Sequence, residues 1–391
     1  MDSLKRLVAM FDIRLLASLI RVFKIINRRV SNAQPLCFTL DGQGNMGSHA
    51  LVLSAFENLP KQTKFVGVLP NLHLLAKNAE VEAISLERVY PSLSIGHYFQ
   101  LGRLARLLSG ASKVYVIGAD NLDGAYSEML SAVLWGVSIA SAQTGIPSKI
   151  FGFSWNDSPT PFAVKLAKWA AASGVKMHLR DSLSFNRFQS QINAGVFSAD
   201  IAFALPDAGA SIETAATSTI KIVVCGAPHS GVSQIGAPSD EFVAFLEMLS
   251  KKGQVSLVPS VDRPGQSEPE YYSRLEPRIA NFRSVSTCKS LFSPMEFQDY
   301  IRDATLVITF RMHPAILSIK NHVPVVMFEY QGKMAGLAND VGLESFSLPY
   351  GLTLENATSV VLRAIDQAHY NRAVIADRVA AIKKRAFENF D

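Results

Sequence analysis

Short apolar runs alternate with helical patterns along most of the chain. Between residues 36 and 205, apolar runs such as SKVYVIGAD (112–120) and KIFGFSW (149–155) end in polar or glycine turns. Helical patterns such as 126–142 and 161–173 follow these runs. Strands that alternate with helices at this spacing predict a parallel sheet covered on both faces. Ligands bind at the carboxyl ends of such strands, so the site residues are expected there.

A second series of strands and helices begins at residue 220. Residues 206–219 lose the periodicity and are rich in Ala, Ser and Thr, which predicts an interdomain linker. The strands KIVVCGAP, QVSLVPSV and TLVITF follow, with a polar loop expected at 262–272 and terminal helices from about residue 355. The predicted fold is therefore α/β, with two Rossmann-like parallel-sheet domains, 31–205 and 220–391, facing a cleft that holds the ligand.

Residues 1–30 have the pattern of a basic amphipathic helix. At 100° per residue, one face collects Leu4, Val8, Phe11, Leu15, Leu19, Val22 and Ile26, and a flank collects Arg6, Arg14, Arg21, Lys24 and Arg28. This pattern is typical of a helix that lies on an anionic bilayer. The alternative is a helix packed on the body of the protein or on a second subunit. The arginines argue against a signal peptide, and no apolar run is long enough to predict a spanning helix.

The composition fits an ordinary globular protein. The 391 residues suggest two or three domains, and 48% apolar with 18% charged residues allows a large core. The three cysteines lie far apart, which excludes a disulfide framework and a zinc site and fits a reducing, cytoplasmic compartment. The net charge of +5 is mild, and no feature points to nucleic acid.

Four groups of polar residues stand at the ends of predicted strands in the first half. Gly42, Gly44 and Gly47 allow tight turns around Asn45; Ser48 is expected to cap the next helix, with His49 on its first turn. An ordinary β–α turn is the alternative. Asp120, Asn121 and Asp123 suit sugar hydroxyls or a metal, or form an Asx-turn. Trp155 and Asn156 could stack on and bind a sugar, or form a surface loop. Arg180 and Asp181 are expected to form a local ion pair that fixes a turn.

The fifth group, in TLVITFRMHPAILSIK, is the strongest candidate. Arg311 lies where a buried strand passes into a helix, so amide groups, the helix dipole and a guanidinium converge on one anion. His313 is placed to act as a general acid once a phosphorylated ligand is bound. Lys333, after the next strand, is placed to reach the same site.

Together these residues resemble the polysaccharide pyruvyl transferases of surface-glycan pathways. The likeness runs from about residue 36 to residue 350 and rests on the following motifs: the turn Gly44, Asn45, Gly47; the R-D-x-x-S of Arg180, Asp181, Ser184; the A-D-x-A-F of Ala199, Asp200, Ala202, Phe203; the R-x-H of Arg311, His313; and Val323, Pro324, Val325 with Tyr330 and Lys333. Members resemble GT-B glycosyltransferases, which agrees with the two-domain prediction.

The resemblance implies transfer of a pyruvyl group from phosphoenolpyruvate to two hydroxyls of a sugar, in a surface polysaccharide or its lipid-linked precursor, with a pyruvate ketal as product. It implies Arg311 as an anion clamp, His313 as acid or positioner, Tyr330 and Lys333 as donor-side residues, and an acceptor on the first domain. His229, in the first loop of the second domain, is also expected to bind the donor. No metal or cofactor other than the co-substrate is expected. The implied location is cytoplasmic, with possible peripheral contact to the inner face of the membrane.

The chain departs from the family pattern at several positions. Ser48 and His49 stand where the family has an aspartate, Ala119 interrupts its glycine triplet, and His229 stands near an expected arginine. Two alternatives therefore remain: a GT-B glycosyltransferase that uses a nucleotide sugar, and a non-catalytic glycan-binding homologue.

Overall fold

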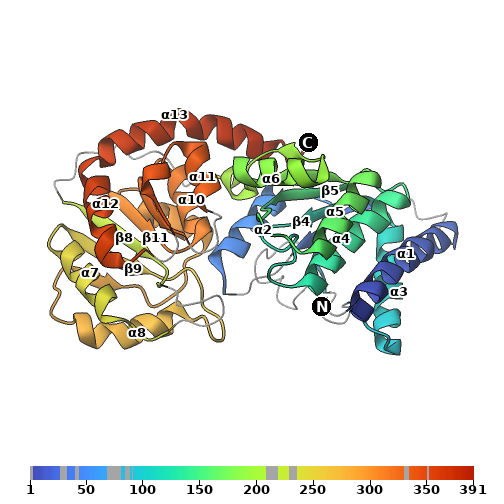
Figure 1. Ribbon diagram of the computed structural model, residues 1–391, viewed down its shortest axis with the longest axis horizontal. Helices are drawn as coiled ribbons and strands as arrows, with labels where there is room; N and C mark the ends of the chain where they lie inside the picture. The colour runs from blue at the N-terminus through green and yellow to red at the C-terminus, as the bar shows by residue number, and fades with distance from the viewer. Residues whose placement is uncertain are drawn as a thin grey trace. The chain divides into compact units, whose positions relative to one another are not determined.

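The computed structural model divides into two compact units, each built on a parallel sheet (Figure 1). It describes residues 3–26, 33–39, 44–67, 81–83, 89, 91–207, 219–228, 236–329, 334–349 and 352–391. Unit 1 comprises 1–41, 51–201 and 385–391, and unit 2 comprises 42–50 and 202–384. The α/β prediction of two Rossmann-like domains is confirmed.

Unit 1 contains a seven-stranded sheet in the order β3-β2-β1-β4-β5-β6-β7. Its strands are β1 (Gln34–Thr39), β2 (Lys64–Gly67), β3 (Val81–Ala83), β4 (Ala111–Ile117), β5 (Ser148–Phe153), β6 (Lys176–Leu179) and β7 (Val196–Phe197). Its helices are α1 (Ser3–Ile26), α2 (Met46–Asn58, which begins in unit 2), α3 (Ile95–Ser109), α4 (Glu128–Gln143), α5 (Pro161–Ala172) and α6 (Ser182–Ile192). The 3₁₀ turn η3 (Ile201–Ala204) begins in unit 1 and continues into unit 2.

Unit 2 repeats this plan with six strands in the order β10-β9-β8-β11-β12-β13. Its strands are β8 (Lys221–Cys225), β9 (Gln254–Val258), β10 (Val285–Thr287), β11 (Leu306–Thr309), β12 (Val325–Phe328) and β13 (Ser347–Leu348). Its helices are α7 (Asp240–Ser250), α8 (Glu268–Ile279), α9 (Pro294–Ile301), α10 (Met312–Lys320), α11 (Met334–Val341), α12 (Leu354–Asp366) and α13 (Ala368–Phe387, which ends in unit 1), with the 3₁₀ turn η4 (Glu344–Phe346).

The core of unit 1 explains why its central helix is apolar on every side. In α4 each residue from Ser131 to Ser141 is buried, as expected for a helix covered all round. One side is covered by α1, which lies beside α3 and α4 (Figure 1). Gly136 makes this contact possible, because a Cβ there would lie 3.0 Å from Cγ1 of Ile13. The helix predicted at the N-terminus is therefore present and packs on the body of the protein.

The unit boundaries differ from the predicted domains at two places. Residues 42–50 belong to unit 2, because the Met46 amide donates to the Ser260 carbonyl (2.9 Å) and the Asp262 amide to the Gly44 carbonyl (2.7 Å). Residues 385–391 belong to unit 1, where the Asn389 carbonyl accepts from Lys149 and the Asn389 side chain accepts from the Gly152 amide.

Most of the predicted linker lies outside the described residues. Among the described residues, no helix is long and apolar enough to cross a membrane.

Candidate active site

The strand order of unit 2 reverses between β8 and β11, and ligands of open α/β sheets bind at such a reversal. Gly226 follows β8 and Arg311 follows β11, so both stand at the carboxyl edge of neighbouring strands. Gly226 has φ +89°, and a Cβ there would lie 3.1 Å from Cγ of Arg311. Glycine at this position therefore lets the arginine side chain lie across the end of β8.

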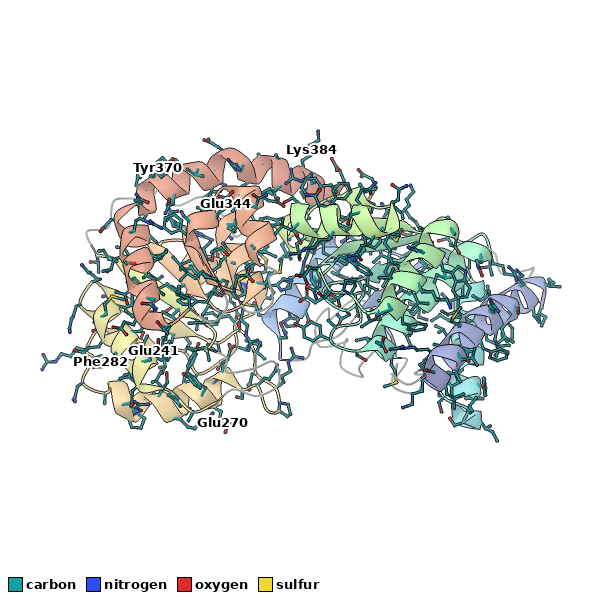
Figure 2. The ribbon with its side chains drawn as sticks, viewed as in Figure 1. Glu241, Glu270, Phe282, Glu344, Tyr370 and Lys384 are labelled. Atoms are coloured by element: carbon teal, nitrogen blue, oxygen red, sulfur yellow. The ribbon has the colours of Figure 1, made fainter. Side chains whose placement is uncertain are left out.

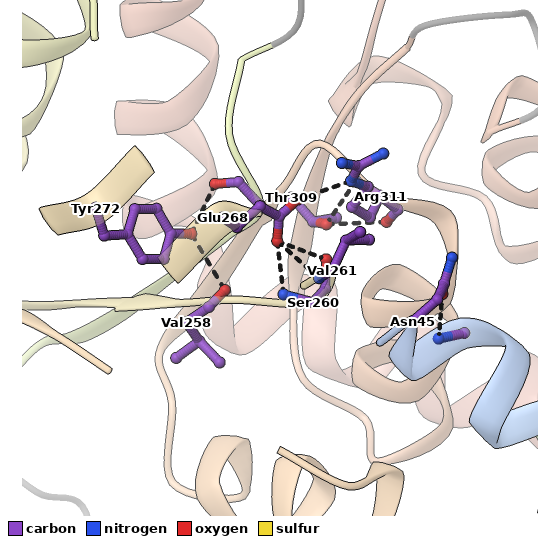
Figure 3. A network of polar contacts seen from close by, with 10 residues as sticks. Asn45, Val258, Ser260, Val261, Glu268, Tyr272, Thr309 and Arg311 are labelled. Atoms are coloured by element: carbon purple, nitrogen blue, oxygen red, sulfur yellow. Dashed lines mark hydrogen bonds and ion pairs between the residues drawn. The ribbon is translucent and has the colours of Figure 1, made fainter. Parts of the chain in front are cut away.

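Arg311 is held at its backbone and at one edge of its guanidinium (Figure 3). Its amide donates to Oγ1 of Thr309 (3.0 Å), and this hydroxyl donates back to the Arg311 carbonyl (2.9 Å). Its Nε donates to Oε1 of Glu268 at 2.9 Å. Its Nη2 is buried and has no hydrogen-bond partner among the described residues. A buried guanidinium donor that lacks a partner is suited to a charge-assisted bond with an anion.

Glu268 is the residue that fixes this arginine, and the sequence analysis missed it. The side chain is fully buried at the start of α8 (Figure 3). Its Oε2 accepts from the Ser260 amide (2.6 Å), the Ser260 hydroxyl (3.1 Å) and the Val261 amide (3.0 Å). Three donors and the helix N-terminus compensate the carboxylate for its burial. Residues 262–272 were expected to be a polar loop, so nothing in the pattern marked Glu268.

The N-terminus of α10 adds a second feature that favours an anion. Eight helices, α3 to α9 and α12, have a Ser, Thr or Asp side chain that caps the first turn. In α10 the N-cap residue is Arg311, which makes no capping bond with its side chain. The positive end of the helix dipole therefore points toward the same place as the Arg311 guanidinium.

The glycine turn from the start of the chain packs directly beside His313. A Cβ on Gly47 would overlap the His313 ring, and a Cβ on Gly44, at φ +70°, would overlap the Asp262 carbonyl. Asn45 forms an isolated antiparallel bridge with Val261. The turn and the R-x-H motif are thus brought together, and each glycine is required by a close approach.

The expected cap of α2 is corrected by the structure. The helix begins at Met46, three residues earlier than predicted, so Asn45 rather than Ser48 stands before it. Oδ1 of Asn45 accepts from the amides of Gly47 (2.8 Å) and Ser48 (3.3 Å). His49 is half-buried on the first turn, and burial lowers its pKa.

The polar residues of unit 1 gather around Arg180, at the carboxyl edge of β4, β5 and β6. Arg180 is buried; it pairs with Asp120 and with Asp200 (3.1 Å), and its Nε donates to the Ser154 hydroxyl (2.7 Å). Asp181, which was expected to pair with Arg180, caps α6: its carboxylate accepts from the amide and from the hydroxyl of Ser184, at 2.7 Å each.

Among the other predicted site residues of unit 1, the prediction for Trp155 is wrong. Asp123 accepts from the Ala125 amide (2.9 Å) in an Asx-type turn and also binds the Asn156 amide group. Asp120 and Asn121 are partly exposed. Trp155 is fully buried: its indole donates to Gln191 (3.0 Å) and its ring packs edge-on to Phe188. Its ring faces are part of the core and are not a surface on which a sugar could stack.

Three predicted site residues, His229, Tyr330 and Lys333, lie outside the described residues. Across the part of the chain that is described, no three His, Cys, Asp or Glu side chains lie close enough to hold a metal ion.

These features define a two-domain α/β protein of the GT-B type, with a candidate anion site at the switch point of its second sheet. Residues 21–332 match the polysaccharide pyruvyl transferase family, and the chain belongs to this family. Among curated protein sequences, none is significantly similar to the chain.

Solved structures with a similar fold include two that contain a bound UDP-sugar. UDP-GlcNAc 2-epimerase from Neisseria meningitidis, bound to UDP-GlcNAc, superposes with a TM-score of 0.58 at 11% identity, covering 91% of this chain and 97% of that one. Alr3699/HepE from Anabaena, in complex with UDP-glucose, gives 0.54 at 13% identity, covering 90% and 98%. At these identities the likeness concerns the fold alone.

Proposed function

We propose that this protein transfers a pyruvyl group from phosphoenolpyruvate to two hydroxyls of a sugar, in a surface polysaccharide or its lipid-linked precursor, to form a pyruvate ketal. Membership of the family supports pyruvyl transfer to a polysaccharide. The observation that carries the choice of donor is the buried Nη2 of Arg311, which lacks a partner among the described residues beside an uncapped helix N-terminus. A small dianion fits these donors.

Each group has a defined part in the proposed reaction. The Arg311 guanidinium and the first turn of α10 bind the phosphate, while His313 serves as general acid. Protonation of the methylene carbon of phosphoenolpyruvate makes C2 electrophilic, and the first sugar oxygen bonds to it. The C2–O bond to phosphate then breaks, and the second sugar oxygen takes its place. The two hydroxyl protons end on the new methyl group and on the released phosphate, so the reaction balances without a metal or redox partner.

The acceptor is assigned to unit 1. Asp120, Asn121 and Asn156 stand at the carboxyl edge of its sheet, where polar side chains can accept and donate to sugar hydroxyls. Because Asp120 also pairs with Arg180, its carboxylate is oriented before any ligand arrives.

A nucleotide-sugar transferase is the second candidate, favoured by the UDP-sugar ligands of the proteins that share the fold. Phosphate release and thermal unfolding separate the two. We expect phosphoenolpyruvate to raise the unfolding temperature and to release phosphate only when a glycan acceptor is present. Arg311→Met should lose both effects, whereas Arg283→Met, a change at an exposed arginine of the same unit, should keep them. Stabilisation by UDP-glucose and not by phosphoenolpyruvate would overturn the proposal.

A further inference from the structure

Helix α1 has two apolar faces, and only one of them is used inside unit 1. Ala9, Ile13, Leu16 and Ile20 are buried against α3 and α4. Oδ2 of the buried Asp12 lies 3.0 Å from Nε2 of His97, which ties α1 to α3. This face accounts for the attachment of the helix to the protein.

The opposite face is also apolar and is open to solvent. Leu4, Leu7, Phe11 and Ile25 fall within about 60° of one another at 100° per residue, and they are 60%, 67%, 55% and 65% exposed. The sequence analysis placed Val8 on this face, but it is buried. Of the 13 large apolar side chains that are strongly exposed among the described residues, nine form what we call the α1/α3 surface: Leu4, Leu7, Phe11, Val22, Ile25, Ile26, Leu93, Ile95 and Phe99. Exposed apolar side chains gathered on two packed helices are typical of an interaction site.

The start of α3 continues this surface. Ile95, Phe99 and Arg106 lie on one side of α3, being four and seven residues apart. The Arg106 guanidinium lies over the ring of Phe23 of α1, 5.4 Å from its centroid. The exposed side of α3 therefore borders α1.

α1 and α3 carry a net positive charge. Together they contain seven Lys or Arg and one Asp, a net charge of +6, whereas the whole chain has +5. The Asp is the buried Asp12, and Glu128 of α4 pairs with Arg6 (3.0 Å), so the other cations leave the surface with an excess of positive charge. Arg14, Arg21 and Arg106 are exposed beside the apolar residues.

We propose that the α1/α3 surface docks on an anionic phospholipid membrane, with α1 lying in the plane of the interface. Apolar side chains enter the boundary between headgroups and acyl chains while the flanking cations meet lipid phosphates. A second copy of the chain is a poor occupant, because two surfaces with the same positive charge repel each other. The inference is independent of the proposed reaction.

Flotation of the full chain with vesicles tests the proposal. We expect binding to vesicles that contain phosphatidylglycerol, weak binding to pure phosphatidylcholine, and release by high salt. Leu7→Gln with Phe11→Gln should weaken the partition about tenfold or more, and Arg14→Gln with Arg21→Gln about tenfold. All four side chains are exposed, so the thermal unfolding midpoint should be retained.

Tyr370→Gln supplies a matched control, since Tyr370 is 68% exposed on α13 of unit 2 (Figure 2). It should bind vesicles like the unaltered protein. Three results would overturn the proposal: no binding to phosphatidylglycerol, equal binding by the Leu7 and Phe11 variant, or a dimer in solution that this variant converts to a monomer.

Discussion

Arg180 in unit 1 and Arg311 in unit 2 both stand between a parallel strand and a helix, yet their surroundings differ. The Arg180 side chain is fully buried, pairs with Asp120 and Asp200, and precedes a helix capped by Asp181. The Arg311 side chain is 16% exposed, meets Glu268 through Nε, and precedes a helix without a side-chain cap. A guanidinium whose donors are used internally stabilises the fold, whereas one that keeps a buried donor for a ligand is suited to bind it.

The largest effect is expected on turnover at the unit 2 site. His313→Ala should reduce phosphate release about a thousandfold, because the general acid is lost, while the unfolding temperature stays within about 2 °C. Steady-state phosphate release and calorimetry measure the two quantities. Turnover at the rate of the unaltered protein would remove His313 from the mechanism.

At Arg180 the large effect is expected on stability. Arg180→Met leaves the buried Asp200 without its cation, which should lower the free energy of unfolding by about 3–5 kcal/mol and the melting temperature by about 10 °C. Arg311→Met is the matched control: Glu268 keeps three donors on Oε2, so the loss should be a few degrees. Equal losses for the two variants would break the distinction between the arginines.

A pH-dependent effect of about 3 kcal/mol on the free energy of unfolding is expected near Arg180. His178, on β6 two residues before Arg180, is buried near Lys149 and Lys176, and these factors lower its pKa from 6.5 to about 4. The unfolded chain then binds more protons than the folded one between these values. Stability is full above pH 6.5 and falls by roughly 3 kcal/mol as the pH drops toward 4. Urea unfolding of His178→Gln should show a shallower pH dependence than the unaltered protein.

The smallest effect concerns how Arg311 is positioned. Glu268→Gln keeps an acceptor oxygen but loses the charge that orients the guanidinium, so the KM for phosphoenolpyruvate should rise about tenfold with a smaller change in kcat. Glu270→Gln, an exposed change two residues further along α8 (Figure 2), should alter neither constant. An unchanged KM in Glu268→Gln would show that Arg311 needs no such support.

Local patterns predicted the parts of this protein that depend on near neighbours. Alternating strands and helices indicated both sheets, and the change from strand to helix placed Arg311 and His313 correctly at its boundary. The partners of Arg180 could not be predicted, because Asp120 lies 60 residues away in sequence. Trp155 was misplaced because a residue just after a buried strand can turn into the core as easily as outward. The buried face of α1 was not recognised, because the small residues Ala9 and Ala17 and the polar Asp12 interrupt its apolar pattern.

The turn around Asn45 has a consequence for how the protein is made. Asn45 pairs with Val261, and Gly47 lies against His313, so the candidate site joins segments more than 200 residues apart. During synthesis the turn leaves the ribosome long before either partner exists, and the site can form only when most of the chain has emerged. If the chain is made as two fragments, divided between residues 201 and 202, the C-terminal fragment lacks residues 42–50 of unit 2. Adding the N-terminal fragment in trans should restore the complete unit.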